Sequence, residues 1–162
     1  MTTAPILLTA SWRAMADRHA AGDRSYVPVR ISLGCPRFWP LAASVPYVPE
    51  LAPGGLLHVE PWDEFTRRYV ERLDRIGVDA IRGRLERIHQ AYGRPLVLLC
   101  FEPDRVDCHR SIAAAWLEQH GLGAVHEVDS PDVQTAKPAH NAHSHPSGQL
   151  SAQLSLDGSE DR

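Results

Sequence analysis

A strand–loop–helix unit in residues 96–128 limits the folds open to this chain more than any other feature. Four apolar residues, 96–99, lead into Cys100, and a polar loop separates them from a helical pattern over 111–120. A short apolar segment over 124–128 follows. A buried apolar run that alternates with a helix is typical of a parallel sheet covered by helices. We therefore expect an α/β fold with a mostly parallel sheet.

The rest of the chain repeats this alternation. Pro28 lies in the second apolar segment and favours an edge strand, because proline donates no hydrogen bond to a neighbouring strand. Gly77 and Gly93 end two amphipathic segments, and Asp79 is expected to cap the second. The predicted strands are 5–9, 27–33, 96–100 and 124–128, and the predicted helices are 11–21, 62–76, 79–93 and 111–120.

Residues 34–61 do not fit either regular pattern. Six prolines in this stretch exclude a long helix or a central strand. Long loops of this kind are uncommon and are usually either functional or disordered. Phe38, Trp39 and Tyr47 give the segment side chains that can pack. We therefore expect an ordered lid or wall.

The composition changes after residue 128. The last 34 residues are rich in Ser, Pro, Gly, Ala and Asp and offer little apolar surface to bury. Such a segment does not compensate the entropy cost of folding. We expect one domain over 1–128 and a disordered tail over 129–162.

Charge and cysteine content exclude some classes of protein. A net charge of −3 gives no overall attraction to nucleic acid or to an anionic membrane. No apolar run approaches the roughly 20 residues of a membrane span, and the N-terminus has no basic leader. Three cysteines are an odd number without the spacing of a disulfide framework. A cytoplasmic protein that does not enter a membrane is expected.

The candidate site lies at the start of the helix near Ser111. A thiolate at Cys108 would be favoured by a helix N-terminus and by the neighbouring His109 and Arg110. Free backbone N–H groups there also bind anions. With Cys100 and Glu102 at the strand end, these five residues are the catalytic candidates. Either cysteine would be nucleophile or ligand, His109 the acid or base, Arg110 an anion clamp and Glu102 the orienting carboxylate.

Two interpretations without catalysis are also open. Cys100 fits a packed strand end, because free cysteine is among the most buried residue types. His109 and Arg110 would then brace the loop against Glu102 and Asp107 as an ion-pair network, and such networks perturb side chains as active sites do.

A metal site is weakly supported by the spacing. Cys100, Cys108 and His109 could supply three ligands, with Cys35 or an acid as the fourth. Paired zinc ligands usually stand about two to four residues apart, and adjacent residues such as Cys108 and His109 seldom chelate one ion. The sequence therefore predicts no metal, and the identity of any cofactor stays open.

A second polar cluster follows the strand at 27–33. In a parallel sheet this loop and the loop 101–109 open at the same edge and could form one pocket. Arg37 and Arg105 would bind phosphate or carboxylate there, and Trp39 could stack on a base. The alternative for Trp39 is that it covers the end of the sheet. These residues suggest a nucleotide or nucleic acid as the partner.

The chain resembles the bacterial family called domain of unknown function 488. The residues that carry the likeness are LVLLCFE (96–102), CHR (108–110), AAAWL (113–117), PVRISLGCPRFWP (28–40) and PELAP (49–53). The match covers roughly residues 5–128. It implies a small Rossmann-like three-layer α/β domain without a settled activity, and its motif positions are Cys100, Glu102, Cys108, His109 and Arg110.

A weaker likeness links the same loop to rhodanese domains and cysteine phosphatases. They also place a cysteine at a strand end and Arg-Ser at the start of a helix. Here the loop contains Pro103 and three acids and has no glycine, so it departs from their anion-wrapping pattern.

Three functional hypotheses follow. The first is an enzyme that acts on a nucleotide, a nucleic acid or another phosphorylated substrate. The second is a binding module that breaks no bond, and the third is sulfur or phosphoryl transfer by a cysteine nucleophile. Substrate, reaction and oligomeric state are left open.

Overall fold

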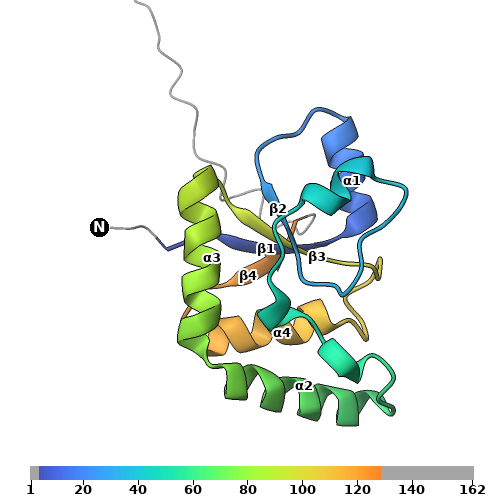
Figure 1. Ribbon diagram of the computed structural model, residues 1–162, viewed down its shortest axis with the longest axis vertical. Helices are drawn as coiled ribbons and strands as arrows, with labels where there is room; N and C mark the ends of the chain where they lie inside the picture. The colour runs from blue at the N-terminus through green and yellow to red at the C-terminus, as the bar shows by residue number, and fades with distance from the viewer. Residues whose placement is uncertain (1–3, 129–162) are drawn as a thin grey trace, which may run out of the picture.

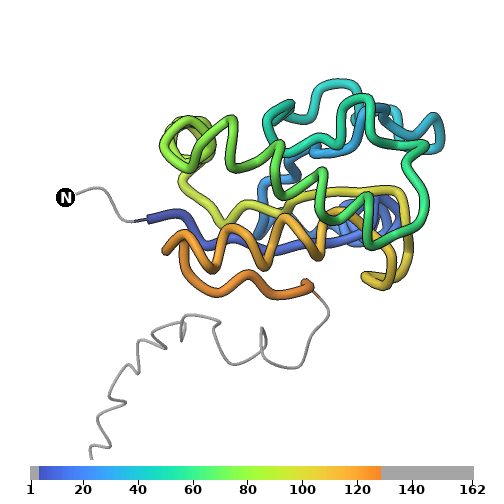
Figure 2. The backbone as a smooth tube through the Cα atoms, turned by 90° about the horizontal axis from the view of Figure 1, so that it is seen from below, coloured from blue at the N-terminus to red at the C-terminus, as the bar shows by residue number. Residues whose placement is uncertain are grey.

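Four parallel strands form the centre of the protein. The computed structural model describes residues 4–128. Its strands pair in the order β2-β3-β1-β4, and their bounds are Leu7–Ser11 (β1), Val27–Arg30 (β2), Leu96–Cys100 (β3) and Val125–Glu127 (β4) (Figure 1). Because every pair is parallel, the carboxyl ends of all four strands lie at one edge of the sheet. Figure 2 shows β4, in orange, running beside β1, in blue.

Helices cover both faces of this sheet. On one face, Trp12 and Met15 of α1 (Trp12–Ala20) pack against Leu8 and Leu99. The other face is covered by α2 (Trp62–Ile76), α3 (Val78–Tyr92) and α4 (His109–Gln119). Figure 1 shows α1 well apart from these three helices. The described residues thus form a small Rossmann-like three-layer α/β domain, as predicted.

Most predicted elements occur where the sequence pattern places them. The helix 62–76 and the strand 96–100 are found with the predicted bounds, and β2 lies at a sheet edge as Pro28 indicated. The second long helix begins at Val78 rather than at Asp79, because Gly77 adopts a φ of 87° and turns the chain between α2 and α3.

Three elements differ from the prediction by two residues or more at one or both ends. β1 is shifted two residues toward the C-terminus, and α4 begins two residues earlier than 111. β2 ends at Arg30 instead of residue 33, because the backbone of Arg30 bonds Pro46 and Val48 of a neighbouring segment. These changes move His109 and Arg110 from the predicted loop into the first turn of α4.

The proline-rich segment 34–61 is an ordered wall. It contains three 3₁₀-helices, η1 (Pro40–Ser44), η2 (Pro49–Leu51) and η3 (Gly54–Leu56). Val48 and Leu51 are fully buried, and the Tyr69 hydroxyl of α2 donates a hydrogen bond to the Leu51 carbonyl at 2.5 Å. This bond and the buried apolar side chains attach the segment to α2.

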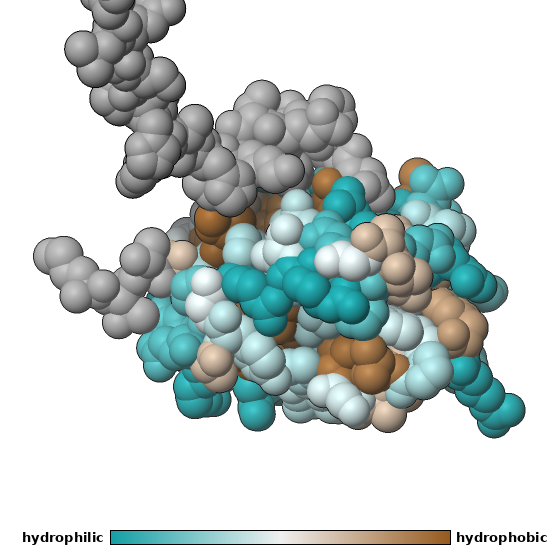
Figure 3. Space-filling view, turned by 90° about the horizontal axis from the view of Figure 1, so that it is seen from above, coloured by the Kyte–Doolittle hydropathy of each residue, from teal (hydrophilic) through white to brown (hydrophobic). Residues whose placement is uncertain are grey.

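The surface and the chain ends add two further findings. Figure 3 shows a face on which hydrophilic residues separate small apolar patches. No helix within the described residues is long and apolar enough to cross a membrane. The tail predicted over 129–162 lies outside the described residues.

Candidate active site

The site forms where β3 ends and α4 begins, at the carboxyl edge of the sheet. Cys100 is the last residue of β3, and Cys108 is the N-cap of α4, with an extended backbone (φ −119°, ψ 132°). Asp107 has a φ of 52°, in the left-handed region, so the chain turns sharply just before the helix. The loop therefore folds back and brings residues 108 and 109 next to the strand that it left.

Four donor side chains converge in this turn. The Cys100 thiol lies 2.5 Å from the Glu102 carboxylate and 3.2 Å from Nδ1 of His109. The Cys108 thiol contacts the same oxygen of Glu102 at 3.2 Å. One donor atom of each residue lies within 4.8 Å of all the others. Both thiols and the imidazole are buried, whereas Glu102 is exposed. The cluster thus has a closed side and an open side.

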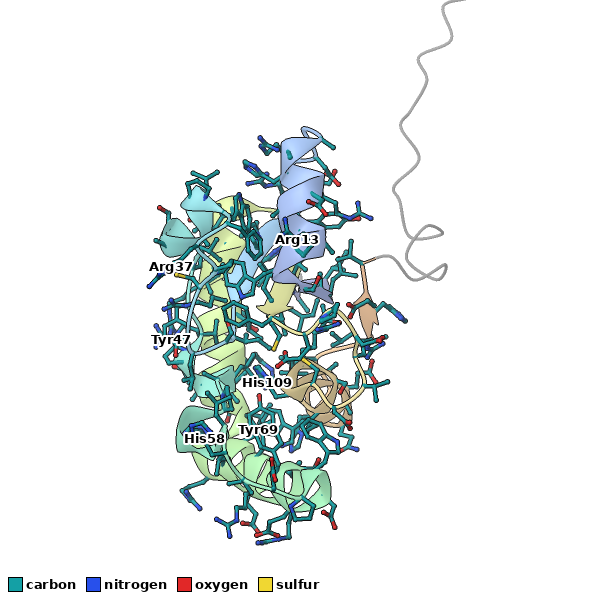
Figure 4. The ribbon with its side chains drawn as sticks, turned by 90° about the vertical axis from the view of Figure 1, so that its right-hand side faces the viewer. Arg13, Arg37, Tyr47, His58, Tyr69 and His109 are labelled. Carbon is teal, nitrogen blue, oxygen red and sulfur yellow. The ribbon has the colours of Figure 1, made fainter. Side chains whose placement is uncertain are left out.

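The orientation of His109 is fixed by its second ring nitrogen. Nε2 lies 3.0 Å from the carbonyl oxygen of Ile31, an acceptor that requires the proton on Nε2. Nδ1 is then the unprotonated nitrogen, with its lone pair toward Cys100. Tyr69 packs edge-on against the imidazole, with ring centroids 5.8 Å apart (Figure 4). Burial lowers the pKa of His109, which favours the neutral form of the ring.

The negative groups of the cluster perturb one another. The hydrogen bond with Cys108, together with burial and the nearby Glu102, raises the pKa of the Cys100 thiol far above its usual range. Burial acts to raise the pKa of Glu102, but the hydrogen bonds from the two thiols outweigh it and the net pKa is lowered. Without a cation, the cluster therefore favours one ionised carboxylate and a protonated Cys100.

Arg110 holds the polar loop in place through hydrogen bonds and an ion pair. Its guanidinium is completely buried and donates to Glu127 at 3.0 Å and to the Cys108 sulfur at 3.4 Å. It also donates to the carbonyl oxygens of Glu102 and Pro103. Arg110 thus holds both ends of the polar loop in place.

Glu127 is the functional residue that the sequence analysis missed. It accepts hydrogen bonds from Arg110 and from Thr9 of β1, the latter at 2.6 Å, and Arg105 lies 3.7 Å away. The sequence contained a feature that could have identified Glu127, because an acidic residue within a short apolar segment needs a partner for its charge. Arg110 therefore pairs with the carboxylate of Glu127 rather than with those of Glu102 and Asp107, and it contacts Glu102 through the backbone carbonyl.

A cavity of about 690 Å³ opens beside the cluster. Three acids contribute to its wall, and no Lys or Arg lines it among the described residues. We call it the acidic cavity; it is lined by Leu57, Val59, Glu60, Pro61, Trp62, Phe65, Glu102, Asp107 and His109. Its charge disfavours an anionic group at the cluster.

The bond between His109 and the carbonyl of Ile31 joins the start of α4 to the segment after β2, but no residue of 34–40 lines the acidic cavity. The ligand-binding candidates are not in the cluster. Trp39 is only 7% exposed and packs edge-on against Trp12 on the opposite face of the sheet. Its indole covers the sheet, which was the alternative interpretation. Arg37 lies at the outer edge of the molecule, away from His109 (Figure 4), and Arg105 pairs with Glu127.

The spacing of the cysteines along the sequence argued against a metal site, but the folded structure brings the candidate ligands close together. Linear distance along the chain placed Cys100 and Cys108 too far apart for a zinc pattern. The left-handed turn at Asp107 reverses the chain between β3 and α4 and brings them together instead. Adjacent Cys108 and His109 both point into the cluster, because one is the N-cap and the other begins the helix.

Comparison with known proteins identifies the fold family. A family model described as the active DUF488-N3 subclade matches residues 30–121. The matched range includes the whole cluster but not Thr9 or Glu127, and it is narrower than the predicted 5–128. No curated protein and no solved structure matches the chain.

Proposed function

The chain belongs to the DUF488 family, and we propose that it is a metal-dependent enzyme that holds a zinc ion on Cys100, Cys108 and His109. Glu102 is the acid or base that faces the acidic cavity. The observation that carries the proposal is the convergence of four donor atoms within 4.8 Å. We place the protein in the cytoplasm, where its cysteines, all free thiols, stay reduced.

The donor set and its dimensions support a tetrahedral ion. Zinc bonds of about 2.0–2.3 Å to nitrogen and sulfur require neighbouring donors to stand about 3.3–3.8 Å apart. The Cys100 sulfur and Nδ1 of His109 are 3.2 Å apart, and the donor atoms of the cluster all lie within 4.8 Å of one another, so these values bracket the range. Thiolates and an imidazole are ligands that select zinc over magnesium or calcium. A bound dication would also stabilise the two cysteine ligands as thiolates beside Glu102.

The groups around the cluster resemble the outer shell of metal sites. A metal-bound histidine commonly donates its other N–H to a backbone carbonyl, as His109 does to Ile31. Arg110 donates to the Cys108 sulfur at 3.4 Å, and such a bond stabilises a thiolate ligand. Both outer bonds orient ligands before any metal is bound.

The open side of the cluster favours catalysis over a purely structural ion. Structural zinc sites are closed by four protein ligands, whereas catalytic sites keep one position for water. Glu102 faces both the cluster and the acidic cavity. A zinc ion lowers the pKa of bound water to about 7. Zinc on these residues would supply a Lewis acid and an activated water, and Glu102 would be the group that accepts and returns a proton.

Other functions find less support. Sulfur or phosphoryl transfer by a cysteine requires a reactive thiolate, but the pKa of Cys100 is raised and the acidic cavity repels an anionic substrate. A module that binds a nucleotide or nucleic acid without catalysis would not need an imidazole nitrogen directed at the Cys100 thiol. An enzyme with the Cys-His-Arg site accounts for more of the geometry.

Metal analysis of the purified protein tests the proposal. Protein reconstituted with zinc and then desalted should hold about one zinc per chain, as a site of this ligand set predicts. Cys108→Ser and His109→Asn should lose it, while Cys35→Ser, which alters a cysteine outside the cluster, should keep it. Cobalt substitution adds a direct readout, because thiolate ligation gives intense near-ultraviolet absorption. A wild-type protein that retains no metal, or a Cys108→Ser protein that retains all of it, would overturn the proposal.

A further inference from the structure

We propose that a second pocket, lined by arginines of α2, binds the phosphate of a nucleotide whose base enters the acidic cavity. This arginine pocket has a volume of about 430 Å³ and lies beside the 3₁₀-helix η3. It is lined by Pro53, Gly55, Leu56, Arg67, Arg68, Glu71, Arg72 and Arg75. The phosphate-binding role stands on its own, whereas the placement of the base above the cluster rests on the proposed function.

The arginine pocket is strongly cationic. Four guanidiniums and one carboxylate belong to its wall. Arg68, Arg72 and Arg75 are spaced four and three residues apart, so they project from the same side of α2. The pocket is positively charged although the net charge of the whole protein is −3. A concave site lined by arginines is suited to a phosphate group.

Two of the arginines are available to a ligand. Arg75 makes no hydrogen bond or ion pair with any residue that the structure describes. Arg68 is held by Glu64 alone, at 2.6 Å, in an exposed ion pair that a phosphate can replace. Arg67 is less available, because it is paired with both Glu64 and Glu71.

Arg72 is already oriented for binding. Its Nε donates to the carbonyl of Ala52 at 3.1 Å and its Nη2 to that of Pro49 at 3.3 Å. These two bonds hold the guanidinium plane against the wall segment and leave Nη1 without a bond among the described residues. A guanidinium that is fixed before binding loses little entropy when a ligand arrives.

The arginine pocket adjoins the acidic cavity. Leu56 lines the first and Leu57 the second, while α2 presents Trp62 and Phe65 to the acidic cavity and Arg68 to the arginine pocket. The combined surface therefore has a basic end and an end with acidic and aromatic groups. Its ligand should have an anionic end and a neutral end.

Trp62 supports a base at the neutral end. Its indole is 36% exposed and stacks on Phe65, with centroids 4.9 Å apart and planes 11° apart. A rigid, partly exposed indole is a platform on which a nucleobase stacks. The acids of the cavity repel phosphate but accept hydrogen bonds from the amino groups of a base. This polarity directs the phosphate to the arginines and the base toward the cluster.

Calorimetric binding of adenosine 5′-monophosphate tests the assignment. The double variant Arg68→Gln/Arg75→Gln should bind it about tenfold more weakly, which is what loss of charge-assisted hydrogen bonds predicts. Arg87→Gln, which removes an exposed arginine of the neighbouring helix α3, should bind like the wild type. Affinity of the wild type should fall as salt is raised, and less steeply in the double variant. Adenosine, which has no phosphate, should bind equally to all three proteins.

Two further binding experiments distinguish failure of this inference from failure of the proposed function. The titrations are repeated on zinc-free Cys108→Ser, in which phosphate affinity should persist even if no metal site exists. They are repeated with an eight-residue oligodeoxyadenylate, because a nucleotide within that strand offers the same base and phosphate. Binding of either ligand that depends on Arg68 and Arg75 supports the inference. Absence of binding by both, or equal loss in Arg87→Gln, would overturn it and leave the metal proposal untouched.

Discussion

The side chains of Arg110 and Glu127 form a buried ion pair that joins the start of α4 to the edge strand β4. Nη2 of Arg110 lies 3.0 Å from Oε1 of Glu127, although 17 residues separate them. Thr9 of β1 donates to the same carboxylate. Because Arg110 also holds the backbone of the loop at Glu102 and Pro103, the pair positions the cluster from a strand outside it. The site therefore depends on the completed sheet.

Removal of the Arg110 charge should be costly. Arg110→Met keeps much of the buried volume but leaves Glu127 without its main partner, so we expect a loss of about 3–5 kcal/mol in the free energy of unfolding by urea. Arg84→Met, which breaks the partly exposed pair with Glu50, should cost about 1 kcal/mol or less. Equal losses in the two variants would show that the buried pair does not brace the loop.

Substitution of Glu102 should affect zinc affinity much less than substitution of a metal ligand. If it acts on bound water, Glu102→Gln retains zinc at the wild-type stoichiometry, whereas His109→Asn, which removes a ligand, loses it. Competition against a chromophoric chelator measures both affinities. A change to an outer group costs about 10–100-fold in affinity, so a larger loss in Glu102→Gln would make Glu102 a ligand instead.

Removal of the Tyr69 hydroxyl should weaken the attachment of the segment 34–61 to α2. Tyr69→Phe leaves the buried carbonyl of Leu51 without its donor, and we expect a loss of about 1–3 kcal/mol in stability. Tyr92→Phe is the matched control, because that ring is exposed. Thermal unfolding of the two variants should differ. If Tyr69→Phe unfolds like the wild type, the bond does not attach the 34–61 segment to α2.

Acid should weaken the ion pairs at the start of α2. Hydrogen bonds from Arg67 and Arg68 lower the pKa of Glu64 from 4.5 to about 2. A pKa that is lower in the folded state contributes stability above pH 4.5, and this contribution is lost as the pH falls from 4.5 toward 2. The stability difference between wild type and Glu64→Gln should therefore shrink over this range in urea titrations. A difference that is constant with pH would contradict the pairing.

Glu64→Gln should also strengthen phosphate binding. The substitution releases Arg68 and leaves Arg67 paired with Glu71 alone, so adenosine 5′-monophosphate should bind about two- to fivefold more tightly at neutral pH. Isothermal calorimetry at fixed salt measures the change. Weaker binding in Glu64→Gln would mean that Glu64 orients the arginines rather than competing for them.

Local patterns in the sequence were enough to predict most of the helices and strands of the fold. The apolar run before Cys100 predicted β3, and the periodic spacing between Trp62 and Gly77 predicted α2, because both depend on burial of a repeated pattern. Boundaries were less predictable where a long-range contact intervenes. Arg30 ends β2 because its backbone bonds residues 46 and 48, which no local pattern indicates.

The site was predicted in part. Cys100, Glu102, Cys108, His109 and Arg110 were identified from costly polar residues beside a helix start, and the structure brings all five together. Trp39 and Arg37 were assigned to the same pocket because their loop opens at the same sheet edge. The indole instead covers the opposite face, since burial of a large aromatic ring on the sheet is strongly favourable.

The order of the residues alone determines that this chain builds a parallel α/β domain with a group of polar and thiol side chains at one strand end, since periodicity and helix signals act over a few neighbours. It does not determine which atoms of those side chains meet. That depends on the left-handed turn at Asp107, on the carbonyl of Ile31 that orients His109, and on Glu127, which binds Arg110 from another strand. Distances of a few ångströms between residues far apart in the chain arise only when the sheet and its helices pack together.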